Sequence, residues 1–172
     1  MAATAFCIRD YRTGDADTTL TIFQRAVREV AARDYTPAEI EAWAGHIDRN
    51  VWANSLERQF TWIATRGNTP AGFASLTDYG HLDMLFVSPD HQRRGVASAL
   101  LMTAEQAVRQ RGMNRMTTEA SLTALPFFKA RGFEVVRAQE MKRCGEVLRN
   151  FRMEKYLKAV EPGVRPARTG QI

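Results

Sequence analysis

Three hydrophobic segments follow one another between residues 60 and 87, and only short turns separate them. They cover residues 60–65, 71–76 and 81–87, and the first turn reads Gly67-Asn68-Thr69-Pro70. Because so few residues cannot carry the chain back to the start of the preceding strand, neighbouring strands must run antiparallel. The chain therefore contains an antiparallel meander, which excludes a doubly wound parallel sheet.

The segments on either side of this meander alternate between helical and extended patterns. Between Asp15 and Arg33, apolar residues recur at spacings of three and four, which predicts a helix. The other predicted elements are helices at 36–43, 51–58, 95–111 and 124–131, and strands at 4–9, 115–120, 133–141 and 147–156. This order predicts one α/β domain over residues 1–156, with a mixed, mostly antiparallel sheet flanked by helices, and a mobile tail over residues 157–172.

Composition excludes two classes of protein. Hydrophobic residues make up 45% of the chain and charged residues 25%, which is typical of a soluble globular domain and incompatible with general disorder. No uninterrupted apolar run exceeds four residues, whereas a membrane-spanning helix needs about twenty. Residues 1–10 carry no basic segment followed by an apolar stretch, so we expect no signal peptide and a cytoplasmic protein.

The charge balance and the cysteines give few indications of a partner. The chain carries 24 Lys and Arg against 19 Asp and Glu, a net charge of +5, without a run of five like charges. This excess permits a nucleic-acid partner but suits a pocket for an anionic small molecule equally well. Cys7 and Cys144 are isolated, which favours neither a disulfide framework nor a zinc site. We therefore expect no metal, no membrane partner and no nucleic-acid partner.

The sharpest functional signal lies where the last strand of the meander passes into the next helix. The segment reads Leu85-Phe86-Val87-Ser88-Pro89-Asp90-His91-Gln92-Arg93-Arg94-Gly95-Val96-Ala97. Gly95 lets the backbone approach a ligand closely, at a helix start whose N–H groups point outward. Arg93 and Arg94 add positive charge, and Arg binds phosphate through two parallel hydrogen bonds. The pattern predicts an anion site, although an ordinary strand–turn–helix with a capping glycine has the same local sequence.

Two motifs in this chain resemble one protein family. Gln92-x-x-Gly95-x-Ala97, placed after L-F-V-S-P, resembles the acyl-CoA pyrophosphate loop of the GNAT superfamily of N-acetyltransferases. Residues 124–133, A-L-P-F-F-K-A-R-G-F, resemble the A-x-x-F-Y-x-x-x-G-F helix of the same superfamily. Residues 121–124 and Asn150-Phe151-x-Met153 are similar to its YafP-like bacterial branch. The resemblance covers residues 5–156 and implies the GNAT fold, with a fourth strand splayed from the fifth and acetyl-CoA as the acyl donor.

The resemblance also implies a set of contacts with the acyl donor. Backbone groups of the fourth strand would hold the pantetheine arm and polarise the thioester carbonyl, the loop would bind the pyrophosphate, and the helix after the fifth strand would line the acyl path. The residues that match these roles are Leu85, Phe86 and Val87 on the strand, Gln92, Arg93, Arg94, Gly95, Val96 and Ala97 in the loop, and Ala124, Phe127, Phe128 and Lys129 on the helix. For the two phenylalanines, packing in a hydrophobic core is the other explanation.

Direct acyl transfer needs a base, because the attacking amine must lose a proton. His81 and Asp83 alternate on the fourth strand, and we predict that both lie on the same face as Leu85. Histidine titrates near neutrality, which suits a base, and the resemblance aligns His81 with the glutamate base of histone-type members. Asp83 could be the base, could orient His81 or could bind a cationic substrate. A polar strand end in solvent is the alternative for both.

Phe128 departs from the family pattern, which often has at this position a Tyr that protonates the departing thiolate. Phe has no proton to give, so water or another group must supply it, or the thiolate leaves unassisted. A thiol with a pKa near ~8.5 is a fair leaving group. Tyr35 and Trp43 stand on the early helices, where the family builds its acceptor pocket, and aromatic core packing is the alternative for both.

We therefore predict an enzyme that transfers an acetyl group from acetyl-CoA to a primary amine, on a small molecule or a peptide, by direct attack in a ternary complex. The rival hypothesis is a non-catalytic acyl-CoA-binding or sensor module on the same fold, and the missing tyrosine at Phe128 supports it. The sequence identifies neither the acceptor nor the oligomeric state, and a homodimer is compatible with it.

Overall fold

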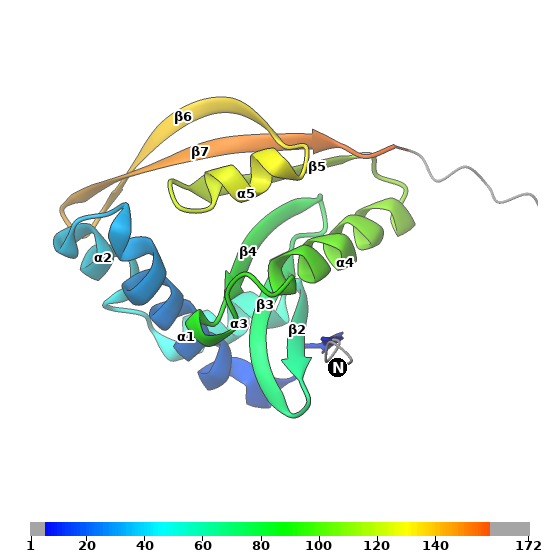
Figure 1. Ribbon diagram of the computed structural model, residues 1–172, viewed down its shortest axis with the longest axis horizontal. Helices are drawn as coiled ribbons and strands as arrows, with labels where there is room; N and C mark the ends of the chain where they lie inside the picture. The colour runs from blue at the N-terminus through cyan, green and yellow to red at the C-terminus, as the bar shows by residue number, and fades with distance from the viewer. Residues whose placement is uncertain (1–5, 159–172) are drawn as a thin grey trace, which may run out of the picture.

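The computed structural model describes residues 6–158 and folds them around one seven-stranded sheet (Figure 1). The strands lie in the order β1-β2-β3-β4-β5-β7-β6. They span Cys7–Asp10 (β1), Phe60–Arg66 (β2), Thr69–Leu76 (β3), His81–Val87 (β4), Arg115–Ser121 (β5), Glu134–Arg143 (β6) and Glu146–Tyr156 (β7). Every neighbouring pair is antiparallel except β4 and β5. The predicted mixed, mostly antiparallel sheet is confirmed.

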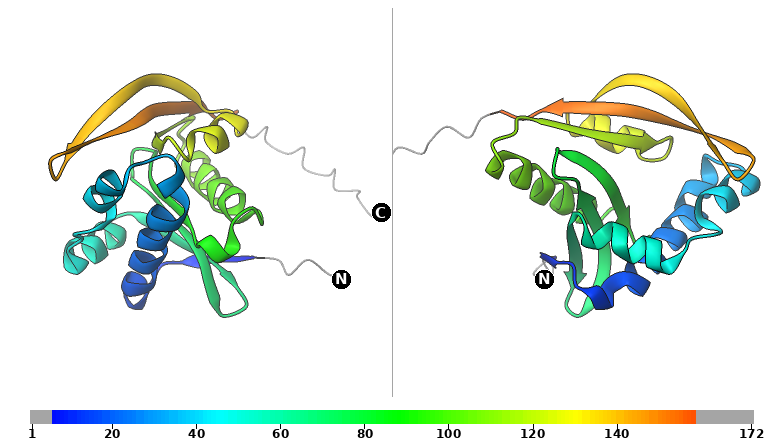
Figure 2. Two further views of the ribbon diagram at one scale, coloured as in Figure 1. Left: turned by 60° about the vertical axis from the view of Figure 1, so that its left-hand side comes forward. Right: turned by 180° about the vertical axis from the view of Figure 1, so that it is seen from behind.

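Helices cover both faces of the first four strands (Figure 2). One face carries α1 (Ala16–Arg25), α2 (Pro37–Ala44) and α3 (Arg49–Glu57), and the other carries α4 (Val96–Gln110). The short helix α5 (Leu125–Ala130) follows β5 and packs against it. Tight 3-10 segments lie at Thr13–Asp15, Ala31–Arg33 and Pro89–His91, and a π-helical segment lies at Ala26–Val30.

Capping residues explain where α2 and α3 begin, the two helices that border the cavity described in the next subsection. The Thr36 hydroxyl accepts a hydrogen bond of 3.2 Å from the Glu39 N–H, and the Glu39 carboxylate accepts one of 2.7 Å from the Thr36 N–H. This capping box starts α2 at Pro37, whose missing N–H costs nothing in the first turn. Asp48 starts α3 in the same way, by accepting from two N–H groups of its first turn.

The sheet divides between β4 and β5, and the division opens its middle. These parallel strands pair only through His81 with Thr117 and Leu82 with Thr118. Beyond Leu82, β4 continues to pair with β3 alone, so its other edge is unpaired. Figures 1 and 2 show β2–β4 and β5–β7 as two arcs that diverge from this point. The predicted splay of the fourth and fifth strands is confirmed.

A bulge interrupts β4 at the same place. Met84 pairs with Ser75, but Leu82 pairs with Leu76, so Asp83 is an extra residue without a partner in β3. Leu82 is consequently buried under α4, whereas Met84, two residues later, packs on the opposite face toward α1–α3. The bulge therefore reverses the alternation of side chains along β4.

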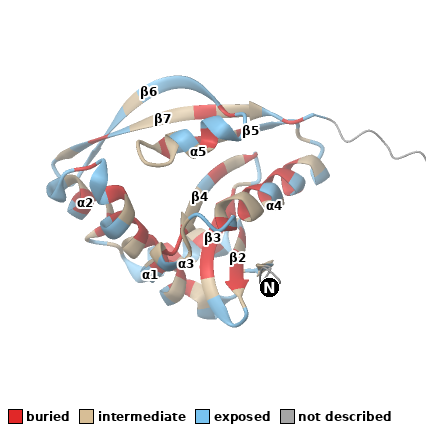
Figure 3. Cartoon of the chain, viewed as in Figure 1, coloured by how far each residue is buried: buried red, intermediate tan, exposed pale blue. Residues whose placement is uncertain are grey.

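Two clusters of buried side chains hold the sheet between its helices. The cluster under α4 and α5 includes Leu82, Leu100, Val108, Met116, Phe128, Phe133 and Met153. The cluster under α1–α3 includes Phe23, Val27, Trp52, Leu56, Ile63 and Phe73. Figure 3 shows that β6 lies outside both clusters and is exposed along nearly its whole length. The two clusters therefore fix β2–β5, β7 and the helices that cover them, while β6 is held through β7.

All the expected helices and strands are present, and their ends differ from the expectation by a few residues. The helix predicted from Asp15 to Arg33 is an α-helix only as far as Arg25, because apolar spacing does not distinguish an α-helix from a π-helical turn that keeps the same face buried. Leu157, which the prediction assigns to the tail, is buried in the core under α4. The predicted mobile tail lies, from residue 159 onward, outside the described residues. No helix within residues 6–158 is long and apolar enough to cross a membrane.

Candidate functional site

The loop between β4 and α4 has the geometry that an anion site requires. Arg93 and Gly95 adopt positive φ angles of 58° and 84°, and α4 begins directly after Gly95 without a side-chain cap. The first N–H groups of a helix have no partner inside it. Those of residues 96–98 bind no other group in the described chain, so they are free to bind an anion.

The loop has open space around Gly95 and carries the positive charges of Arg93 and Arg94. A Cβ atom placed on Gly95 would meet no atom within 4 Å. Arg93 and Arg94 are exposed, and neither forms an ion pair within residues 6–158. The Gln92 side chain bonds within the protein instead: its Nε2 donates a hydrogen bond of 2.9 Å to the Val87 carbonyl. Gln92 thus holds the loop to the end of β4, while backbone N–H groups and two guanidinium groups face outward.

A cavity of about 290 Å³, the loop cavity, runs from this loop along the unpaired edge of β4. Of the predicted donor-binding residues, those that line it are Leu85, Phe86, Val87, Gln92, Ala97, Ala124, Phe127 and Phe128. The π-helical segment adds Val27 and Val30 to the wall. Five predicted residues do not line it: Arg93, Arg94 and Gly95 are exposed in the loop, Val96 is buried between α4 and the sheet, and Lys129 is exposed outside the cavity.

Phe128 serves both the core and the cavity wall. Its side chain is 4% exposed, and its ring packs edge-to-face against Phe127 and Phe133 with centroids 5.3 and 5.1 Å away. The same ring lines the loop cavity. Phe128 therefore belongs to the hydrophobic core and also borders the cavity, and its contact with an acyl donor stays a prediction.

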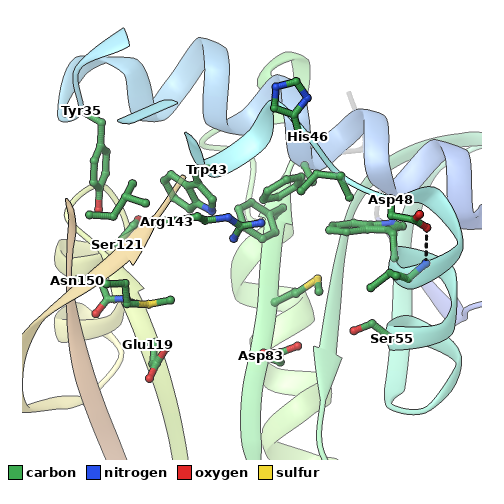
Figure 4. Close-up of a pocket in the computed structure, with 18 of the residues that line it drawn as sticks. Tyr35, Trp43, His46, Asp48, Ser55, Asp83, Glu119, Ser121, Arg143 and Asn150 are labelled. Atoms are coloured by element: carbon green, nitrogen blue, oxygen red, sulfur yellow. Dashed lines mark hydrogen bonds between the residues drawn. The ribbon is translucent and has the colours of Figure 1, made fainter. Parts of the chain in front are cut away.

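A second cavity of about 470 Å³, the helix cavity, lies between α1–α3 and the β6–β7 hairpin (Figure 4). Aromatic side chains form much of its wall: Phe23, Tyr35, Trp43, Trp52 and Phe86. Polar side chains also line it: His46, Asp48, Ser55, His81, Asp83, Glu119, Ser121, Arg143 and Asn150. Arg149 borders the cavity with its backbone, because its side chain lies on the other face of β7 from Leu148 and Asn150.

The two cavities share part of their walls at the gap between β4 and β5. The residues that line both are Trp43, Asp83, Phe86, Glu119 and Ser121. A molecule in the loop cavity would therefore meet a molecule in the helix cavity beside two carboxylates. This arrangement can bring two substrates together without a covalent intermediate on the protein.

His81 is half-buried in the wall of the helix cavity. Its Nδ1 lies 2.8 Å from the Thr117 Oγ1, and its ring stacks on Tyr79 with centroids 6.4 Å apart. Burial lowers the pKa of His81 from its usual 6.5, while the negative charges of Asp83 and Glu119 act in the opposite direction. A histidine with a lowered pKa is neutral at pH 7, and a neutral imidazole can accept a proton.

Asp83 occupies the bulge of β4 and is exposed at the junction of the cavities. It accepts a hydrogen bond of 2.9 Å from the Gln59 amide. The prediction that His81 and Asp83 share a face with Leu85 is wrong. Leu85 packs toward α4, whereas His81 lines the helix cavity with Met84, because the bulge at Asp83 reverses the alternation.

Glu119 is a candidate residue that the sequence analysis did not identify. It stands on β5 across the gap from Asp83, is exposed and lines both cavities. Along β5, buried Met116, Thr118 and Ala120 alternate with this outward face. That alternation was a usable signal, but the nearness of Glu119 to Asp83 follows only from the pairing of β4 with β5.

Tyr35 braces the helix cavity through its hydroxyl. The hydroxyl donates a 2.7 Å hydrogen bond to the Arg149 carbonyl on β7 and accepts a 2.9 Å bond from the Leu122 N–H after β5. Burial raises the pKa of Tyr35 above its usual 10.0. Both bonding positions are thus used within the fold, and only the ring faces the cavity. Trp43, the other predicted acceptor-side residue, lies against this ring with centroids 5.3 Å apart.

Comparison with known proteins places this geometry in one family. Residues 31–157 match the family model described as the acetyltransferase (GNAT) domain. The N-acetyltransferase YafP of Escherichia coli (strain K12) is 40% identical over 146 residues, which are 85% of this chain and 93% of YafP. The resemblance to the YafP-like branch is thereby confirmed.

Solved structures show the same architecture. The GCN5-related N-acetyltransferase from Rhodopseudomonas palustris superposes with a TM-score of 0.87 at 36% identity, covering 91% of this chain and 99% of that one. PaiA N-acetyltransferase from Thermoplasma acidophilum, solved in complex with coenzyme A, has a TM-score of 0.73 at 19% identity, with 88% and 99% covered. This second likeness concerns the fold alone.

Proposed function

This chain belongs to the GNAT family of N-acetyltransferases, and from that membership we propose that it transfers an acetyl group from acetyl-CoA to a primary amine by direct attack in a ternary complex. One observation carries the proposal: the loop cavity and the helix cavity meet at the β4–β5 gap, beside Asp83 and Glu119. The loop cavity would hold the donor, and the helix cavity the acceptor.

The loop side supports donor binding through the backbone. The pyrophosphate would accept hydrogen bonds from the free N–H groups at the start of α4, next to Arg93 and Arg94. The pantetheine arm would lie along the unpaired edge of β4 at residues 85–87 and extend the strand. An N–H of this edge would also stabilise the negative charge that develops on the thioester oxygen.

The proton transfer would use the pair on β4. Asp83 lines both cavities, so it would hold the amine at their junction. His81 lies on the acceptor side and is kept neutral by burial, so it would accept the proton as the amine nitrogen attacks. A nitrogen–carbon bond forms, the carbon–sulfur bond breaks, and the thiolate leaves with the electron pair.

The leaving thiolate would receive its proton from solvent. Phe128 lines the loop cavity at the family's tyrosine position and has no proton to give. Coenzyme A carries an alkyl thiol, which is far more acidic than an alcohol or an amine, so it can depart as the thiolate. Acetyl transfer on this site therefore does not depend on a protein acid at residue 128.

The test measures free thiol released from acetyl-CoA in the presence of a panel of primary amines. We expect release that depends on one class of amine, together with a higher melting temperature in acetyl-CoA than in equal NAD or ATP. The rival function, a non-catalytic acyl-CoA sensor, is favoured by Phe128. Strong stabilisation by acetyl-CoA without amine-dependent thiol release across the panel would decide for the sensor. The cytoplasmic location, the mobile tail and the homodimer remain predictions of the sequence.

A further inference from the structure

The helix cavity carries opposite charges on different walls. Asp83 and Glu119 stand at the β4–β5 gap, and Arg143 stands on the β6–β7 hairpin. Figure 4 shows Arg143 reaching from the hairpin into the cavity below Trp43, with the two carboxylates on the strands at its lower end. A ligand that fills this cavity would therefore meet negative charge at one place and positive charge at another.

These charges have no ionic partners within the fold. Among the described residues, Arg143 has no carboxylate within 4.0 Å. Glu119 forms no ion pair there either, and Asp83 is bonded only to the neutral Gln59 amide. A charged side chain that lines a cavity without a counter-ion is available to bind a charged group of a ligand.

The wall between these charges is aromatic. Rings of Tyr35, Trp43 and Phe86 border the same space, and the rings of Tyr35 and Trp43 lie edge to face. Such a wall favours a flat or aliphatic body over a second polar group. The volume of about 470 Å³ suits a small molecule.

We propose that the acceptor is a small zwitterionic amine, whose amino group meets Asp83 and Glu119 and whose carboxylate is bound across an apolar body by Arg143. The proposal rests on the acetyl-transfer function above and names its substrate class. A guanidinium group matches a carboxylate by two parallel hydrogen bonds, which a carboxamide cannot accept in the same way. Removing the carboxylate of the acceptor should therefore weaken its binding much more than removing a neutral polar group would.

Three amines with one body test this inference: 4-(aminomethyl)benzoate, 4-(aminomethyl)benzamide and benzylamine. For each, kcat/KM is measured by thiol release, and binding is measured by calorimetry in the presence of coenzyme A. We expect the benzoate to bind and to react at least about tenfold better than the other two. In the Arg143→Gln variant, this preference should fall to about onefold, while the values for benzylamine should stay within about twofold.

The Arg137→Gln variant is the matched control. Arg137 is exposed on β6 and lines neither cavity, and its substitution removes the same net charge from the same hairpin. It should keep the preference for the benzoate, and all three proteins should show equal stabilisation by acetyl-CoA.

The outcomes separate the inference from the proposed function. Equal reaction of benzoate and benzamide would overturn the inference and leave acetyl transfer standing. Preferential binding of the benzoate that depends on Arg143, but without thiol release, would support the zwitterion site and count against acetyl transfer. Failure of all three amines both to bind and to react would overturn the inference.

Discussion

The loop cavity and the helix cavity meet at one gap in the sheet, but they are built in different ways. Most of the loop cavity comes from two short stretches, residues 83–97 and 118–128, and its key contacts are backbone groups. The helix cavity draws side chains from α1, α2, α3 and four strands, which span residues 23–150. Backbone groups can bind the same donor whatever side chains surround them, whereas an acceptor site made of side chains can change with few substitutions.

The two cavities also differ in charge. In the loop between β4 and α4, Arg93 and Arg94 are both positively charged, which suits phosphate groups. The helix cavity combines carboxylates with a guanidinium group and aromatic rings. Substitutions in the loop cavity should therefore change the affinity for the donor. Substitutions in the helix cavity should change turnover, the affinity for the acceptor, or the hydrogen bonds of Tyr35 that hold the cavity in shape.

The largest effect is expected at Gly95. Gly95→Glu should lower acetyl-CoA affinity by roughly 10³-fold or more, because its carboxylate would occupy the anion site and displace hydrogen bonds worth about 1.5–3 kcal/mol each to a charged group. Gly112→Glu is the control: Gly112 also has a positive φ, 73°, and open space around it, but it follows the far end of α4. Calorimetric titration with acetyl-CoA makes the comparison, and normal binding by a folded Gly95→Glu protein would show that the loop is not the donor site.

Turnover should fall strongly when the β4 pair is changed. His81→Gln and Asp83→Asn should each lower kcat by about 10²–10⁴-fold at saturating amine while acetyl-CoA affinity changes little. Glu119→Gln, at the same junction, shows by comparison whether the second carboxylate contributes. Wild-type turnover in both β4 variants would remove the pair from the mechanism.

The pH dependence of kcat/KM identifies the base within that pair. Because burial lowers the pKa of His81, activity should stay constant as the pH falls to 6.5 and decline only at lower pH, where the imidazole becomes charged. The His81→Gln protein should lack this decline in its residual activity. An acidic limb that persists unchanged in His81→Gln would assign the titrating group elsewhere.

A smaller effect is expected where the helix cavity is braced. Tyr35→Phe removes two hydrogen bonds and leaves the Leu122 N–H without its partner, which should cost about 1–3 kcal/mol of unfolding free energy and raise the KM for the amine. Tyr79→Phe is the control, because the Tyr79 side chain is 71% exposed. Urea unfolding and acceptor titration measure both quantities. Equal stability of the two variants would mean that the Tyr35 hydroxyl is not a brace.

The smallest change is expected at Phe128. A site that already releases its thiolate without a protein acid should gain little from Phe128→Tyr, and a new hydroxyl buried without a partner would cost about 1–3 kcal/mol of stability. Turnover across pH is compared for the two proteins. A tenfold or larger increase in the Tyr form would contradict this expectation and show that wild type lacks an effective acid.

The loop cavity could be predicted from the sequence in good part. Gly95 and the residues around it form a local strand–turn–helix, and such geometry depends on neighbours in the chain, so a short motif specifies it. The expected element order and the mixed sheet are confirmed for the same reason, because turns, caps and alternation are local signals. The splayed strands, also confirmed, were expected only from the resemblance to the GNAT superfamily. The donor roles assigned to these residues stay predictions.

The helix cavity could not be predicted in the same way. Alternation placed His81 with Leu85, but the bulge at Asp83 reversed the faces, and a bulge is set by how β3 and β4 pair rather than by either strand alone. Glu119 and Arg143 carry no motif, and each enters the site only because β5 and the β6–β7 hairpin lie across the gap from α2 and β4. The sequence by itself determined the elements and the loop that would bind the donor, because these depend on contacts between near neighbours in the chain. The tertiary structure alone decided which charges face the acceptor, because that depends on contacts between residues far apart in the chain.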